Sequence, residues 1–183
     1  MIHERHDLWR RAASYAERMH RGQFRRDGET PYAAHPMRVA LTVASVFGCD
    51  DPRALAVACL HDVIEDTTAD YEDLLNLIGK DIADDVAALS KNPALPSALR
   101  EAAYDEVLEK ASWRAKIVKL ADVIDNMADA GHGDEESEVS RGRRERLIDR
   151  ARRAIDIARR DPAEPLAPAA EIAEAALRRF KAR

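Results

Sequence analysis

The stretch LAVACLHDVIEDT, residues 55–67, decides how this chain folds and what it can bind. Six apolar residues come first, and four titratable side chains then follow within six positions, namely His61, Asp62, Glu65 and Asp66. An apolar run that starts after Asp51 and Pro52 predicts a buried helix from residue 51 to about residue 66. Burying four titratable groups at its end is unfavourable unless they bind something. The alternative is an ordinary polar helix end with solvated acids.

The spacing of these four side chains suits a shared ligand. In a helix, His61 and Glu65 lie on one face, and Asp62 and Asp66 lie on another, because residues four apart are neighbours. The adjacent His and Asp side chains can both reach one cation at the edge of the helix. The segment therefore predicts half of a metal site.

Two further segments offer candidate ligands. The segment VKLADVIDN, residues 118–126, places Asp122 and Asn126 four apart beside an apolar helical stripe. The segment TPYAAHP, residues 30–36, places His35 directly before Pro36, which predicts that His35 is an N-cap facing out of the helix start. Read alone, Asp122 is more often a surface acid paired with Lys119, and His35 is more often a simple cap.

Together the three segments give two imidazoles and two carboxylates, contributed by His35, His61, Asp62 and Asp122. This mixed nitrogen and oxygen set suits Mn²⁺, Fe²⁺ or Zn²⁺ and is typical of hydrolytic sites with open coordination positions. Such a metal lowers the pKa of a bound water and polarises a phosphoryl oxygen. Glu65 and Asp66, one turn beyond, are then placed to orient that water or move protons.

Helical periodicity dominates the rest of the chain and predicts an all-α fold. We expect one compact domain over residues 1–183, with about eight to ten helices, a metal-site core at about 7–130 and C-terminal helices at about 138–182. The acidic segment 131–140 is predicted to be a surface loop. Three prolines predict a linker before the last helix: Pro162, Pro165 and Pro168.

Composition excludes several classes of protein. The chain has 29 basic and 34 acidic residues, so its net charge of −5 gives no reason to expect nucleic acid or anionic membranes as partners. The longest apolar stretch, residues 39–48, is too short to span a bilayer, and the N-terminus does not resemble a secretory signal. Cys49 and Cys59 are expected to be buried free thiols. These features predict a soluble, cytoplasmic protein.

The order His, then His-Asp, then Asp resembles the signature of the HD phosphohydrolases. More closely, the chain is similar to the alarmone hydrolases, which include the hydrolase domains of RelA/SpoT-type enzymes and the animal SpoT homologues. The similarity covers roughly residues 7–130, and the Glu65-Asp66 pair after His-Asp is its most specific part. The matching segments are RRDG (25–28), TPY (30–32), HP (35–36), ACLHDVIEDT (58–67), VKLAD (118–122) and NM (126–127).

This resemblance implies hydrolysis of the 3′-pyrophosphate of guanosine tetra- or pentaphosphate, commonly with Mn²⁺. It implies that His35, His61, Asp62 and Asp122 bind the metal and that Glu65 and Asp66 act on the nucleophilic water. It also implies a set of substrate contacts, in which an arginine pair binds phosphates, an asparagine binds ribose, and a tyrosine and a lysine line the pocket: Arg25, Arg26, Asn126, Tyr32 and Lys119.

The chain departs from the family pattern at several positions. The family often has a basic residue at the position of Val123, and His or Tyr at the position of Asp125. A family Arg followed one turn later by Tyr corresponds here to Arg144 followed by Ile148. Arg144, together with Arg141 and Arg143, is therefore a candidate phosphate contact whose alternative is a solvated basic face.

Other functions stay open after this comparison. Because of the departures, the sequence does not decide which nucleotide base the site prefers. An adenosine alarmone or the 2′-phosphate of NADPH is therefore an alternative substrate to the guanosine alarmones. Another HD nucleotidase acting on nucleoside or deoxynucleoside monophosphates is a second alternative, and a silent HD module that only binds a nucleotide is a third. A homo-oligomer is compatible with the sequence.

Overall fold

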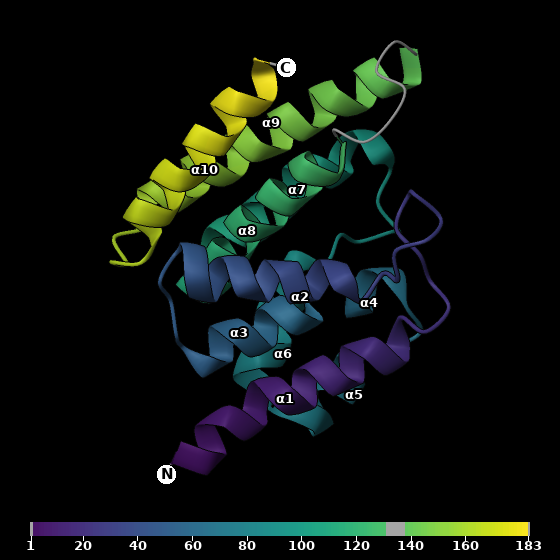
Figure 1. Cartoon of the computed structure of the whole chain (residues 1–183), viewed down its shortest axis with the longest axis vertical. Helices are drawn as coiled ribbons and strands as arrows, with labels where there is room; N and C mark the ends of the chain where they lie inside the picture. Colours follow the sequence, from purple (N-terminus) through teal and green to yellow (C-terminus); the bar gives the residue numbers. More distant parts are fainter. Residues whose placement is uncertain (1, 131–137, 183) are drawn as a thin grey trace.

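The computed structural model describes residues 2–130 and 138–182, and helices joined by loops make up both ranges (Figure 1). The all-α prediction is confirmed, because the described residues contain no strand and only one isolated bridge, between Phe24 and Pro31. Within the described residues, a short π-helix, η1, accompanies ten α-helices. In chain order the elements are α1 (Ile2–Met19), α2 (Ala34–Leu41), η1 (Thr42–Val46), α3 (Pro52–Leu60), α4 (Val63–Asp66), α5 (Tyr71–Ile78), α6 (Lys80–Leu89), α7 (Ser97–Lys110), α8 (Trp113–Ala130), α9 (Glu138–Arg160) and α10 (Leu166–Lys181).

Helix α8 is the central element. It packs against α2 and α3 on one side and against α9 and α10 on the other, while α1 covers α3 (Figure 1). Ile117, Leu120 and Ala121 are fully buried, which accounts for the apolar stripe of α8. The buried apolar side chains of all these helices form one cluster. The side chains of α8 that face the cavity are therefore held by a helix packed on both sides.

Predicted helix boundaries are confirmed at two positions, a capping serine at the start of one helix and a glycine at the end of another. The Ser112 hydroxyl accepts a hydrogen bond from the backbone N–H of Arg114 at 3.1 Å, as expected for the start of α8. Gly48 has φ of 68° and closes the α2–η1 segment, a conformation that glycine adopts without steric strain. The acidic segment 131–140 falls partly outside the described residues, and α9 already begins at Glu138.

The N-cap predicted at His35 is wrong. The N-cap of α2 is Ala33, and the backbone N–H of His35 donates to the carbonyl of Tyr32 at 2.9 Å, so His35 lies inside the first turn. Pro36 is the third residue of the helix, two positions later than expected, and it is tolerated there because no first-turn N–H needs an intrahelical partner. Likewise, Pro168 belongs to the first turn of α10 and not to the linker before it.

The continuous helix predicted over 51–66 is also wrong, because it breaks at His61 and Asp62. Helix α3 ends at Leu60, and Asp62 adopts φ of −102° and ψ of −3° before α4 begins. The imidazole Nδ1 of His61 lies 2.9 Å from the carbonyl of Ala58, one of the carbonyls left without a partner at a helix end. The break points both ligand side chains to the same side.

Two further predictions concern the cysteines and the membrane. Cys49 and Cys59 are free and buried, as expected. None of the helices in the described ranges has the length and apolar character required to cross a bilayer.

Candidate metal centre

The four side chains predicted as metal ligands converge on one point between α2, the α3–α4 break and α8. The two Nε2 atoms of His35 and His61 are 3.1 Å apart, and Asp62 Oδ2 is 3.3 Å from the first and 3.2 Å from the second. Asp122 Oδ1 lies 3.3 Å from His35 Nε2 and 3.7 Å from His61 Nε2. His35, His61 and Asp62 alone already offer three ligand atoms within 4.8 Å of one another.

These separations fit the residues around a divalent cation. Ligand atoms about 2.1 Å from a metal are about 3.0 Å apart at neighbouring octahedral positions and about 3.4 Å apart at tetrahedral ones. The observed separations, from 3.1 to 3.7 Å, match these edges. The centre is also shielded, because the side chain of His35 is 1% exposed, while that of Asp62 is 20% exposed and faces the cavity. The donor set therefore suits a metal with an open position on the side of Asp62.

Neighbouring groups hold both imidazoles in place. His35 Nδ1 lies 2.6 Å from Asp125 Oδ2, and His61 Nδ1 contacts the Ala58 carbonyl, so each ring directs its Nε2 into the centre. Arg38 fixes Asp125 in turn, through Nε at 2.6 Å and Nη2 at 2.8 Å. Asp125, which departs from the family pattern, thus orients the imidazole of His35, a candidate ligand. The spacing of residues in the sequence did not indicate that Asp125 contacts His35.

The electrostatics of the cluster show how strongly it attracts positive charge. Burial disfavours the charged form of His35, yet hydrogen bonds to Asp122, Asp125 and Asp62 raise its pKa to about 11. Burial is similarly outweighed at His61, where the charge of Asp62 and a hydrogen bond to Asp122 raise the pKa to about 9. A divalent cation would replace these protons, because a metal-bound imidazole is neutral.

The two acids beyond the ligands lie on different sides of α4. Asp66 Oδ2 is 2.6 Å from the Tyr32 hydroxyl, which is also 2.7 Å from Asp62 Oδ2, so a single phenol links the two carboxylates. Glu65 points the other way, and its carboxylate accepts a hydrogen bond from the backbone N–H of Lys91 at 3.1 Å. Burial raises the pKa of Glu65, which suits a group that accepts and returns a proton.

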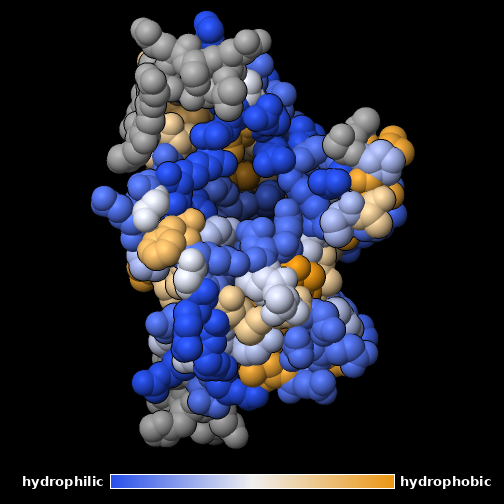
Figure 2. Space-filling model, turned by 90° about the vertical axis from the view of Figure 1, so that its right-hand side faces the viewer, coloured by the Kyte–Doolittle hydropathy of each residue, from blue (hydrophilic) through white to orange (hydrophobic). Residues whose placement is uncertain are grey.

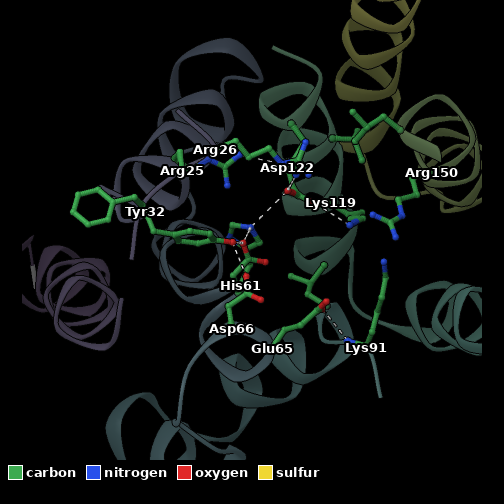
Figure 3. A pocket seen from close by; sticks show the side chains of 16 residues that line it. Arg25, Arg26, Tyr32, His61, Glu65, Asp66, Lys91, Lys119, Asp122 and Arg150 are labelled. Atoms are coloured by element: carbon green, nitrogen blue, oxygen red, sulfur yellow. Dashed lines mark hydrogen bonds and ion pairs between the residues drawn. The ribbon is translucent and has the colours of Figure 1, made fainter. Parts of the chain in front are cut away.

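A cavity of about 350 Å³ opens over the cluster and has two basic walls. Hydrophilic residues surround a hollow on this side of the molecule (Figure 2). Arg25 and Arg26 lie on one side of the ligands, and Lys91, Lys119 and Arg150 lie on the other (Figure 3). The remaining lining residues that the structure describes are Phe24, Tyr32, His61, Asp62, Glu65, Asp66, Leu89, Asp122, Val123, Asn126 and Leu147.

The arginine wall is built from the loop before α2 and from α8. Arg25 donates from Nε to Asp129 at 2.7 Å and from Nη2 to Asn126 Oδ1 at 3.1 Å, and its guanidinium lies 5.2 Å from the centre of the Tyr32 ring. Asn126 also donates to Asp122. Arg26 lines the same side of the cavity. Five of the six predicted substrate residues therefore line one space: Arg25, Arg26, Tyr32, Lys119 and Asn126.

Arg144 is the exception. Its Nη2 donates to the carbonyl of Phe180 at 2.6 Å, and its guanidinium lies 4.6 Å from the centre of the Phe180 ring, so the side chain is directed to α10. The cavity is lined instead by Leu147 and Arg150 of α9. The sequence also did not predict that Lys91 lines the cavity, because no motif includes its position after α6.

Comparison with known proteins identifies the family of the chain. Residues 12–148 match the HD domain family. A guanosine-3′,5′-bis(diphosphate) 3′-pyrophosphohydrolase of Drosophila melanogaster is 42% identical over 117 residues, which make up 63% of this chain and 65% of that protein. The human protein of the same name is 36% identical over 119 residues, 64% of this chain and 66% of its own length. The matched part thus spans just under two thirds of these animal relatives.

Solved structures share the fold. One, of a metazoan ortholog of SpoT that hydrolyzes ppGpp and plays a role in starvation responses, aligns with a TM-score of 0.79 and 28% identity over 94% of each chain. A structure from Listeria monocytogenes aligns with a TM-score of 0.63 over 84% of this chain and 97% of its own, at 19% identity, and shows the fold alone.

Proposed function

The chain belongs to the HD domain family, and from this premise we propose that it hydrolyses the 3′-pyrophosphate of nucleotide alarmones such as guanosine tetraphosphate. The observation that carries the proposal is a four-ligand cluster lying at the base of a cavity with basic walls on both sides. Phosphate groups at a metal need flanking cations to balance their charge. The names of the animal relatives support the same reaction.

We propose Mn²⁺ as the metal, with Fe²⁺ or Zn²⁺ as alternatives that the nitrogen and oxygen donors also suit. The ligands would be His35, His61, Asp62 and Asp122. When bound, the metal supplies Lewis acidity to a phosphoryl oxygen and lowers the pKa of a water. The cavity that opens beside Asp62 would have room for both the phosphoryl oxygen and the water.

The protein residues would carry the remaining chemistry. The oxygen of a water molecule forms a bond to the phosphorus that is attached to the ribose 3′ oxygen. The bond between this phosphorus and the ribose 3′ oxygen breaks, and pyrophosphate leaves. Glu65 or Asp66 accepts the proton of the water, and the ribose oxygen gains a proton. Arg25, Arg26 and Lys119 would stabilise the phosphate charge, because cations aimed at phosphoryl oxygens lower the barrier to phosphoryl transfer.

The test is pyrophosphate release by metal-stripped protein to which Mn²⁺, Fe²⁺ or Zn²⁺ is added back. Guanosine tetraphosphate, its adenosine counterpart, NADPH and nucleoside monophosphates are compared side by side, and inorganic phosphate is measured as well, because the last two can release only that product. The two alarmones together identify the preferred base. We expect release from an alarmone with Mn²⁺, and loss of release in His61→Ala and Asp62→Ala. The exposed α9 variant Asp156→Asn is the matched control.

Two results would overturn the proposal. Inorganic phosphate released from monophosphates, with alarmones untouched, would identify a different HD nucleotidase. Tight nucleotide binding without turnover under any metal would identify a silent binding module.

We also propose that residues 1–183 form one domain that acts in the cytoplasm without nucleic-acid or membrane partners, as a monomer or a homo-oligomer. The net charge of −5 and the two free cysteines support this setting. Sedimentation of the purified chain would establish its oligomeric state.

A further inference from the structure

The cavity wall opposite the arginine pair carries two cations, Lys91 and Arg150, that neither the motifs nor the proposed reaction accounts for. Lys91, Lys119 and Arg150 line it, and they come from the chain after α6, from α8 and from α9 (Figure 3). Lys119 Nζ is 2.8 Å from Asp122 Oδ2. The wall is therefore continuous with the metal ligands and extends away from them toward Lys91 and Arg150.

The two lysines are crowded against one aromatic ring. The Nζ atoms of Lys91 and Lys119 lie 5.4 Å and 5.2 Å from the centre of the buried Tyr104 ring. Burial, and after it the charges of Arg150 and Lys119, lower the pKa of Lys91, although a hydrogen bond to Glu101 opposes the shift. Because the positive charges of Arg150 and Lys119 act on Lys91, a further anion would be stabilised here.

One carboxylate serves three cations behind this wall. Glu101 accepts from Lys91 Nζ at 2.9 Å, from Arg150 Nη2 at 2.7 Å and from Arg153 Nη2 at 2.7 Å. Arg153 Nε also pairs with Asp105 at 2.6 Å. The two oxygens of Glu101 are thus shared among three cations, of which, within the described residues, only Arg153 has a second carboxylate partner, Asp105. The pairing with Glu101 uses only one of the two terminal nitrogens of Arg150, and a guanidinium has five donors in all.

We propose that Lys91 and Arg150 bind the terminal phosphate of the pyrophosphate group that the enzyme removes. This inference rests on the proposed function, since it identifies where one part of that substrate lies. The phosphorus under attack must lie at the metal ligands. Lys119 pairs with Asp122, and Arg150 and Lys91 lie farther along the same cavity wall (Figure 3). A second phosphate attached to that phosphorus would reach Lys91 and Arg150 on this wall.

The two walls would then have separate tasks. The arginine wall carries Asn126 and Tyr32, which offer an amide and an aromatic ring, and it suits the nucleoside and its other phosphates. The wall of Lys91 and Arg150 offers an ammonium and a guanidinium group beside Glu101, and these groups suit a phosphate terminus. The enzyme would therefore distinguish a 3′-diphosphate from a 3′-monophosphate.

The experiment measures binding of pyrophosphate and of inorganic phosphate to the Mn²⁺-loaded protein by calorimetry, at a fixed free Mn²⁺ concentration. In Arg150→Gln we expect pyrophosphate affinity to fall at least about tenfold, because a charge-assisted hydrogen bond is lost, while phosphate affinity changes less than about twofold. Arg150→Lys, which keeps the charge but not the fork, should lose less. Arg152→Gln, an exposed neighbour on α9 paired with Asp149, is the control.

Equal weakening of both ligands in Arg150→Gln would overturn the proposal, and so would unchanged pyrophosphate binding. Thermal unfolding of each variant separates a binding defect from a loss of fold. Because calorimetry requires no turnover, a wild-type protein that binds pyrophosphate through Arg150 without hydrolysing any alarmone would contradict the proposed function and leave this subsite standing.

Discussion

The metal cluster and the contact between α9 and α10 both enclose charged side chains, yet they satisfy them in opposite ways. In the cluster, the ligand atoms of His35, His61, Asp62 and Asp122 face one another across 3.1 to 3.7 Å. In the helix contact, Arg144 donates to a backbone carbonyl and stacks on Phe180. Ligand atoms that converge on one point can bind a cation, whereas a guanidinium bonded to a backbone carbonyl and packed on a ring stabilises the fold.

The largest expected effect comes from breaking the cluster at its fourth member. Asp122→Asn should reduce the Mn²⁺ content and lower pyrophosphate release at least about a thousandfold, because metal stabilisation of phosphoryl charge is worth several kcal/mol. Metal analysis and initial rates measure both. Full metal content with a near-normal rate would limit the ligands to His35, His61 and Asp62, the three that lie closest together.

A core truncation in α10 should affect stability and not the metal. Leu177 is 1% exposed, so Leu177→Ala is expected to lower the free energy of unfolding by about 2–5 kcal/mol. Mn²⁺ affinity of the folded variant should stay unchanged. Urea denaturation and Mn²⁺ titration check the two parts. Leu99→Ala, at a position 59% exposed, is the control and should change the free energy of unfolding by less than about 0.5 kcal/mol. Loss of Mn²⁺ binding in folded Leu177→Ala would contradict the separation of the two regions.

Asp125→Asn tests the support of the cluster rather than its ligands. The His35 ring would lose a charged partner at 2.6 Å, so Mn²⁺ affinity should fall about 10–100-fold. Calorimetric titration with Mn²⁺ measures the change. The exposed α9 variant Asp149→Asn serves as reference. An unchanged affinity would mean that packing alone orients the ring.

The smallest effect is expected at Arg144. Arg144→Gln removes the contacts to Phe180 and should lower the free energy of unfolding by about 1 kcal/mol. The kcat and KM for the alarmone should change less than about twofold. A tenfold rise in KM would instead support the substrate role that the family resemblance implies.

The sequence alone determined much about this protein. Apolar periodicity predicted an all-α fold, and three short segments supplied the candidate ligands, because imidazole and carboxylate chemistry can be read from residue type. The segment that contains His61 and Asp62 was interpreted as one helix, since local spacing does not reveal a break that long-range contacts stabilise. The role of Asp125 was hidden for the same reason, because its partners His35 and Arg38 lie in another helix.

Only the tertiary structure decided which arginines of α9 face the cavity. Each residue advances about 100° around a helix, so a shift of one or two positions turns a side chain to a different neighbour. Arg144 turns to α10, while Arg150 turns to the cavity and meets Lys91 and Glu101 from distant parts of the chain. The sequence determined the ligands and their chemistry, and packing decided which charged side chains surround them.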